Sequence, residues 1–220
     1  MIKAVIFDFN GTLFMDHDIN RIAWLQTLKE ITNNKIDIKS FYEKRKSLHN
    51  YLIVKDAFKE MNEEANEETI QFWSIQKEIY YQNYCLEHQR NKMTDGAEEL
   101  LDYLKENNVK IGLCTSSINE NVNFYYKNVN LDRWFKKELT VYDNGKYHDK
   151  IDMYKDCAAL LEENIKDIIV FEDSPKAIKE VIEAGCQKVI AIKREDSPSL
   201  PQIKQTIEDF TKLDKSIFNE

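Results

Sequence analysis

The residues best suited to chemistry stand where three apolar runs of the sequence end. Each run is typical of a buried strand, and polar or acidic side chains follow it directly. Ligands of an open parallel sheet bind at the carboxyl ends of its strands, so we expect these side chains to share one edge. The three groups are Asp8, Asn10 and Thr12; Thr115, Ser116 and Ser117; and Glu172, Asp173 and Ser174.

A divalent cation would suit this edge. Asp8, Glu172 and Asp173 would bring three carboxylates together, which is unfavourable unless a cation neutralises them. Mg²⁺ prefers carboxylate oxygens, a carbonyl and several waters as ligands. The sequence therefore predicts Mg²⁺ as the cofactor.

The elements that must position these residues alternate between strands and helices. Apolar, β-branched runs predict strands at 2–7, 109–115, 167–173 and 188–193. Residues with helical spacing separate them, as in the stretch after Asp95. Alternation of this kind predicts an α/β fold, a Rossmann-like parallel sheet core with helices on both faces.

Residues 15–90 interrupt this alternation. The stretch contains no strand candidate, and helical periods are visible at 19–31, 38–50 and 68–88. We therefore predict an all-helical cap subdomain at 15–90, inserted into a core made of 1–14 and 91–220. Its aromatic residues are expected to pack a small bundle; they are Trp24, Phe41, Phe72, Trp73, Tyr80 and Tyr81.

Composition excludes several classes of protein. A net charge of -8 argues against non-specific binding of nucleic acid or of an anionic membrane. No apolar run is long enough to span a bilayer and no signal peptide is readable, so we expect a cytoplasmic protein. The four cysteines have no CxxC pair and are expected to be reduced and buried. His49, His88 and His148 have no partner at metal-ligand spacing and are expected to be structural or exposed.

The ordered segments DFNGTL, CTSS, a lysine near residue 150 and FEDSPKAI resemble the four motifs of the haloacid dehalogenase-like superfamily. The likeness is to its branch with a helical cap after the first motif, which includes β-phosphoglucomutase and phosphoglycolate phosphatase. It spans nearly the whole chain. The first and fourth motifs are specific in combination, and the other two are weak alone.

The resemblance implies a role for each matching residue. Asp8 would attack phosphorus to form an aspartyl-phosphate. Thr115 would donate to a phosphoryl oxygen, with Ser116 beside it, and a lysine would neutralise charge in the transition state. The metal ligands would be Asp8, the main-chain carbonyl of Asn10, Asp173, and Glu172 directly or through water.

The chain departs from the family pattern at the lysine. The segment GKYHDKIDMY lacks the usual Lys-Pro and offers both Lys146 and Lys150. Lys150 directly precedes a predicted helix and is the favoured candidate; either could instead be a solvated surface lysine.

Asn10 is the second departure. Family members with two acids in this loop use the second to protonate the leaving oxygen and activate water, and an amide can do neither. A nearby group could substitute, with Asp16, His17 and Asp18 the closest in sequence. Alternatively, the leaving group needs no proton, as in acyl phosphates, or turnover is poor and the chain binds a phosphorylated ligand. Carbon–halogen hydrolysis is formally open and ranks low.

The predicted function is that of a magnesium-dependent phosphatase of a small phosphorylated metabolite, with a monomer favoured. The first alternative is a phosphomutase, which would need a second phosphate site; Arg21, Arg45 and Lys46 are candidates in the cap. The second is a catalytically weak relative that binds a phosphorylated ligand or a protein partner.

Overall fold

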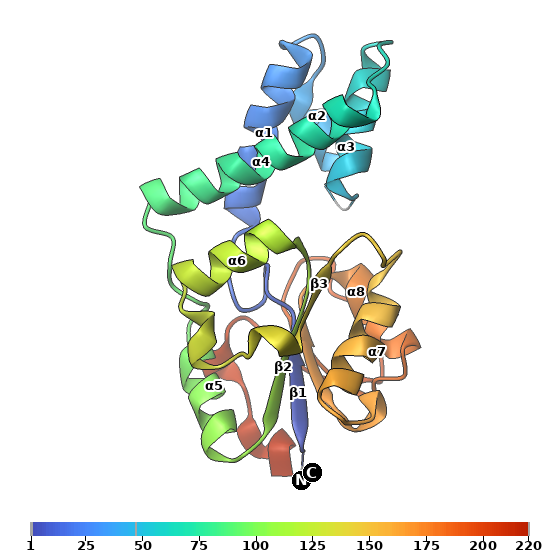
Figure 1. The fold of residues 1–220 in the computed structure, drawn as a ribbon. Helices are drawn as coiled ribbons and strands as arrows, with labels where there is room; N and C mark the ends of the chain where they lie inside the picture. Colours follow the sequence, from blue (N-terminus) through green and yellow to red (C-terminus); the bar gives the residue numbers. More distant parts are fainter. Residues whose placement is uncertain (1, 47, 220) are drawn as a thin grey trace. The chain divides into compact units, whose positions relative to one another are not determined.

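The computed structural model describes residues 2–46 and 48–219. The chain divides into two compact units (Figure 1). The core unit comprises Met1–Met15 and Lys92–Glu220, and the cap unit comprises Asp16–Asn91.

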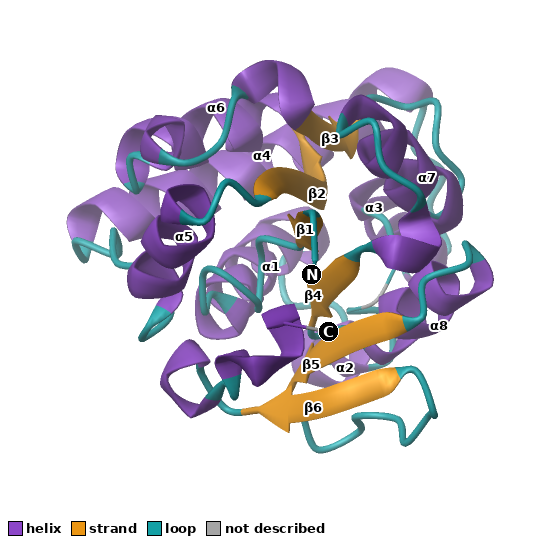
Figure 2. Cartoon of the chain, turned by 90° about the horizontal axis from the view of Figure 1, so that it is seen from below, coloured by secondary structure: helices purple, strands orange, loops and turns teal. Residues whose placement is uncertain are grey.

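The core unit contains a six-stranded sheet in the order β3-β2-β1-β4-β5-β6, with every neighbouring pair parallel (Figure 2). The strands are β1 (Ala4–Phe7), β2 (Lys110–Ile118), β3 (Thr140–Asp143), β4 (Ile169–Glu172), β5 (Lys188–Ile192) and β6 (Ile203–Ile207). The four predicted strands correspond to β1, β2, β4 and β5. The sequence reading missed β3 and β6, which form the two edges of the sheet.

The central strand β1 is buried along its whole length. Its last residue, Phe7, pairs with Leu113 on β2 and with Phe171 on β4. The Phe7 and Phe171 rings stack with their centroids 4.7 Å apart. This register brings the residues that follow β1, β2 and β4 to the same edge of the sheet.

Helices cover both faces of the sheet, which confirms the predicted fold class (Figures 1 and 2). The helices α5 (Ala97–Glu106) and α6 (Asn119–Asn128) lie on one face, and α7 (Lys150–Leu160) and α8 (Pro175–Glu183) lie on the other. As its sequence suggests, α8 begins with Ser174 as N-cap, whose hydroxyl accepts from the Ala177 N–H, and with Pro175 in the first turn.

The cap unit is built from α1 (His17–Thr32), α2 (Ile38–Glu43), α3 (Asn50–Glu60) and α4 (Glu67–Glu87). No strand occurs among its described residues, 16–46 and 48–91. The prediction of one helix over 38–50 is wrong: α2 ends at Glu43 and α3 begins at Asn50, while residue 47 lies outside the described residues. Phe41 and Tyr42 in α2 are buried, but Leu48 is exposed. The buried apolar positions of the predicted helix therefore do not continue to its expected end.

The cap aromatics divide between interior and surface. Trp24, Phe41 and Tyr81 are buried as expected, whereas Phe72 is 56% exposed and does not belong to the packed interior. The four cysteines of the chain are all buried and unpaired, as predicted. Within the described part of the chain, no helix is both long and apolar enough to cross a membrane.

Candidate active site

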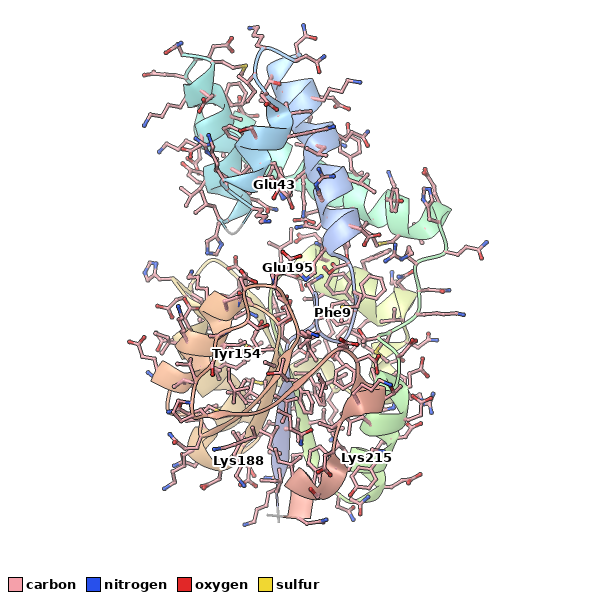
Figure 3. All side chains as sticks on the ribbon, turned by 180° about the vertical axis from the view of Figure 1, so that it is seen from behind. Phe9, Glu43, Tyr154, Lys188, Glu195 and Lys215 are labelled. Carbon is pink, nitrogen blue, oxygen red and sulfur yellow. The ribbon has the colours of Figure 1, made fainter. Side chains whose placement is uncertain are left out.

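The loop after β1 presents Asp8 at the carboxyl end of the sheet. The Asp8 N–H donates to the Phe171 carbonyl at 3.0 Å, which ties the start of the loop to β4. The chain then turns back on itself: the Gly11 N–H bonds to the Phe14 carbonyl at 2.7 Å, and the Phe14 N–H to the Phe9 carbonyl at 2.9 Å. Gly11 has φ of 78°, a left-handed conformation that favours glycine. Phe9, labelled in Figure 3, is fully buried beneath the loop.

Lys150, the first residue of α7, joins two of the acidic residues. Its Nζ lies 2.6 Å from Asp8 Oδ1 and 2.9 Å from Glu172 Oε2. All three side chains are buried, and Glu172 is fully so. The structure thus brings a strand end, a helix start and a second strand end together around one ammonium group.

The carboxylate of Glu172 accepts hydrogen bonds on both oxygens. Oε2 accepts from Lys150 and from the Tyr154 hydroxyl, and Oε1 accepts from the N–H groups of Asp173 and Ser174 at 3.1 and 3.0 Å. Tyr154, labelled in Figure 3, comes from the next turn of α7 and is fully buried. Four donors therefore hold the Glu172 carboxylate in one orientation.

Asp173 has a charged partner of its own. Arg194, two residues after β5, donates from Nη1 to Asp173 Oδ2 at 2.9 Å and also pairs with Asp196 at 3.3 Å. Asp173 is 3% exposed at its side chain, and Arg194 is 31% exposed. The guanidinium therefore fixes one oxygen of Asp173 from the solvent side.

The acidic cluster fits a divalent cation. Asp8, Glu172 and Asp173 each offer one oxygen such that the three atoms lie within 4.8 Å of one another. Asp8 Oδ2 is buried and makes no hydrogen bond. A buried carboxylate oxygen without a partner is costly, and a bound cation would satisfy it. The residues present therefore match the hard, oxygen-rich donor set of Mg²⁺.

The electrostatics of the cluster reflect the crowding of like charges. Burial, reinforced by the charge of Glu172, raises the pKa of Asp8 well above its usual range, and Lys150 opposes this shift. Burial alone would lower the pKa of Lys150, but the carboxylates of Asp8 and Glu172 raise it well above its ordinary value. Lys150 therefore stays charged beside Asp8 and Glu172, while Arg194 pairs with Asp173.

Asn10 takes part in a compact hydrogen-bond ring with Ser117 and Tyr125. The Asn10 Nδ2 donates to the Tyr125 hydroxyl at 3.0 Å, and the Ser117 hydroxyl donates to Asn10 Oδ1 at 2.8 Å. The two hydroxyls lie 3.1 Å apart. Thr115 makes a longer bond to Asn10 Oδ1, at 3.3 Å. The Phe9 ring stacks on Tyr125 at 4.2 Å between centroids, which holds the tyrosine in place.

The structure separates the two candidate lysines. Lys146 is exposed, forms a 2.9 Å ion pair with Asp156, and lines a shallow groove along β3 with Tyr142 and Tyr147. Lys150 lies within the acidic cluster. Ser116 is exposed, and it is Ser117, its neighbour, whose hydroxyl reaches Asn10.

The groups considered as substitutes for an acid at position 10 belong to the cap unit. Asp16 is buried and accepts from the Tyr81 hydroxyl at 2.6 Å. Asp18 pairs with Arg90 at 2.8 Å, and this bond holds the pKa of Asp18 below its usual range. His17 is exposed. His49, His88 and His148 are exposed as well, in agreement with the prediction.

The cap cations considered for a second phosphate site all have acidic partners. Arg45 lies 2.9 Å from Asp56 and 3.2 Å from Glu60. Arg21 and Lys46 share the carboxylate of Glu43, labelled in Figure 3, at 3.4 and 2.8 Å.

Sequence reasoning missed Tyr154, Tyr125 and Arg194. Tyr154 stands four residues after Lys150, a spacing that places two residues on one helix face and could have indicated it. Arg194 directly follows the strand predicted at 188–193. Inspecting the residues at the carboxyl end of that strand would have found it. Tyr125 carries no such signal, because its position depends on how α6 packs.

Comparison with known proteins agrees with this geometry. The family model of haloacid dehalogenase-like hydrolases matches residues 2–185. No curated protein matches the chain. Among solved structures, the chain is similar to an HAD hydrolase (family IA, variant 3) from Entamoeba histolytica HM-1:IMSS, with 27% identity, a TM-score of 0.85, and coverage of 99% of this chain and 97% of that one.

Two further structures share the fold. The β-phosphoglucomutase (pgmB) from Clostridium difficile is 22% identical over 100% of this chain and 96% of that one, with a TM-score of 0.79. A protein from Haemophilus somnus described as a predicted phosphoglycolate phosphatase is 17% identical over 99% and 97%, with a TM-score of 0.72. With the family model matching most of its length, the chain belongs to the haloacid dehalogenase-like hydrolases.

Proposed function

We propose that this protein is a Mg²⁺-dependent phosphatase of a small phosphorylated metabolite, acting through an aspartyl-phosphate on Asp8. One observation carries the proposal. Asp8 contacts Lys150 at 2.6 Å through one oxygen, its other oxygen is buried without a hydrogen bond, and Asp8 clusters with Glu172 and Asp173. A carboxylate held by a cation on one side and facing acidic side chains on the other suits a nucleophile that shares a metal site.

The residues of the chain divide the work as follows. Asp8 is the nucleophile, and Lys150 offsets the negative charge of the transferring phosphoryl group, with Thr115 and Ser116 as donors to its oxygens. Asp8, Asp173 and the Asn10 carbonyl would hold Mg²⁺. Glu172 keeps Lys150 and the backbone after β4 in place. The bound ion would supply further positive charge at the phosphoryl oxygens.

The ion pairs of the cap favour a phosphatase over a phosphomutase. A mutase must bind the second phosphate of a bisphosphate intermediate, and the cations considered for that task are Arg21, Arg45 and Lys46. Each already contacts a carboxylate within 3.4 Å. A phosphate would have to displace these partners, so these three cations are not preset for a second phosphate.

Steady-state assays with p-nitrophenyl phosphate and acetyl phosphate in the presence of Mg²⁺ test the proposal. We expect turnover that is lost in EDTA and in Asp8→Ala, together with an acid-stable ³²P label on the wild-type chain that hydroxylamine removes. Lys146→Met serves as the matched lysine control and should retain activity. Turnover of neither substrate above the Asp8→Ala background would leave the second alternative, a protein that binds a phosphorylated ligand.

A further inference from the structure

Position 10 is held by a hydrogen-bond ring whose pattern fits an amide. The Asn10 Nδ2 donates to Tyr125 at 3.0 Å, and Ser117 donates to Asn10 Oδ1 at 2.8 Å. The Tyr125 proton can then be donated to the Ser117 oxygen, 3.1 Å away. Each of the three groups donates once and accepts once around the ring. Such a ring needs a side chain that is both donor and acceptor, as an amide is.

An acid placed at position 10 would not be free within this ring. A carboxylate only accepts hydrogen bonds, so Tyr125 and Ser117 would both donate to it. Neither hydroxyl would then have a proton left for the 3.1 Å contact between them. A protonated carboxyl group could replace the amide in the ring, but its O–H would donate to Tyr125. In the first state the side chain has no proton to give to a leaving group, and in the second its proton is already directed at Tyr125; both hydroxyl partners come from the core unit itself.

We propose that Ser117 and Tyr125 are positioning residues that fix the Asn10 amide, so that this site acts on phosphoryl donors whose leaving group departs without a proton. This inference rests on the proposed function and names its substrate class: acyl phosphates and comparable donors with weakly basic leaving groups. The packing around the ring supports a fixed arrangement, because Tyr125 is 2% exposed and stacks on Phe9.

The chemistry of such a substrate balances without an acid at position 10. Asp8 forms a bond to phosphorus while the phosphorus–oxygen bond to the acyl group breaks, and the electron pair leaves with the acyl oxygen as a carboxylate. Water then attacks the aspartyl-phosphate, which is itself an acyl phosphate. That phosphorus–oxygen bond breaks with its electron pair returning to Asp8, and the proton released by the water leaves with phosphate and solvent.

The leaving-group dependence of kcat/KM tests this inference on the full chain with Mg²⁺. Phenyl phosphate and p-nitrophenyl phosphate have similar shapes and differ in the basicity of the leaving oxygen. We expect the wild type to prefer p-nitrophenyl phosphate strongly and Asn10→Asp to keep that preference. The double variant Asn10→Asp with Tyr125→Phe should reduce the preference by up to about 10²- to 10⁴-fold, the range that positioned proton transfer contributes.

Two variants control for changes in packing. Tyr125→Phe keeps the ring that stacks on Phe9, and Tyr126→Phe removes a neighbouring hydroxyl that bonds to Thr140 at 2.7 Å, outside the ring. Asn10→Asp with Tyr126→Phe should behave as Asn10→Asp does. The inference is overturned if Asn10→Asp alone removes the preference, or if the double variant with Tyr125→Phe retains it.

Solvent exchange of the Asn10 side-chain amide protons, followed by NMR, separates this inference from the proposed function. The resonances are assigned by their loss in Asn10→Asp. Tyr125→Phe removes the acceptor of the Asn10 Nδ2–H bond and should speed their exchange by about fivefold, the factor expected for one hydrogen bond, and Tyr126→Phe should not. Protected protons in a chain without turnover would refute the phosphatase and leave the positioning roles standing. Unprotected protons in an active enzyme would refute the positioning roles alone.

Discussion

The substitution Lys150→Met tests whether Lys150 balances the charge of the acidic cluster. Methionine has a similar length and no charge, so the change removes the contacts at 2.6 Å to Asp8 and 2.9 Å to Glu172 while filling the same space. Removing one partner of a buried ion pair costs about 3–5 kcal/mol. Glu172 keeps its bonds from Tyr154 and two backbone N–H groups, so we expect the lower end of this range.

For a domain of about 150 residues, a loss of about 3 kcal/mol lowers Tm by roughly 6 to 12 °C. Differential scanning calorimetry in EDTA measures this shift directly. Adding Mg²⁺ should raise the Tm of Lys150→Met again, because a ligand at about 100 times its Kd stabilises the folded state by about 2.7 kcal/mol. Lys146→Met is the control: this lysine is 57% exposed at its side chain, and its loss should cost under about 1 kcal/mol. Equal Tm values for the two variants in EDTA would refute the reasoning.

Three other outcomes can be measured on the same protein. Mg²⁺ should raise the Tm of the wild type and have a much smaller effect on Asp173→Asn; equal shifts would place the ion elsewhere. Ser174→Ala removes the N-cap of α8 and should cost about 1 kcal/mol in urea unfolding, whereas Ser174→Gly should cost only a few tenths. Burial raises the pKa of Cys85 to about 12 and that of Cys186 to about 11, so both thiols stay protonated at pH 8. Their reaction with a disulfide reagent should be slow, rise with pH and accelerate in urea; rapid labelling of native protein at pH 8 would contradict this.

The strands that the sequence predicted are those with an unambiguous signal. β1 and β4 are buried at every residue, so an unbroken apolar run reveals them. The missed strand β6 alternates between half-buried and exposed positions until its last residue, and the last two residues of β3 are only half-buried. Both lie at the edges of the sheet, where one side of the strand has no neighbour and polar residues are tolerated.

The part of the site that could be predicted is the part set by the order of the strands in the parallel sheet. Asp8, Glu172 and Asp173 meet because parallel neighbouring strands end together, and Lys150 joins them from the start of a helix. The sequence favoured Lys150 over Lys146 because Lys150 stands directly at the start of a predicted helix, and its contact with Asp8 depends on the packing of α7. The ring around Asn10 was inaccessible from the sequence, because Tyr125 reaches it from a separate helix.

Hydrogen bonds between the two segments of the core unit explain how a helical module can be inserted after the first strand. The Thr94 N–H bonds to the Leu13 carbonyl at 2.8 Å, and the Thr94 hydroxyl bonds to the Thr12 carbonyl at 2.7 Å. The chain therefore leaves the core unit and returns to it at neighbouring points, and hydrogen bonds within the core unit hold these two points together. A helical module can therefore be inserted at this point while the loop after β1 keeps the hydrogen bonds that shape it.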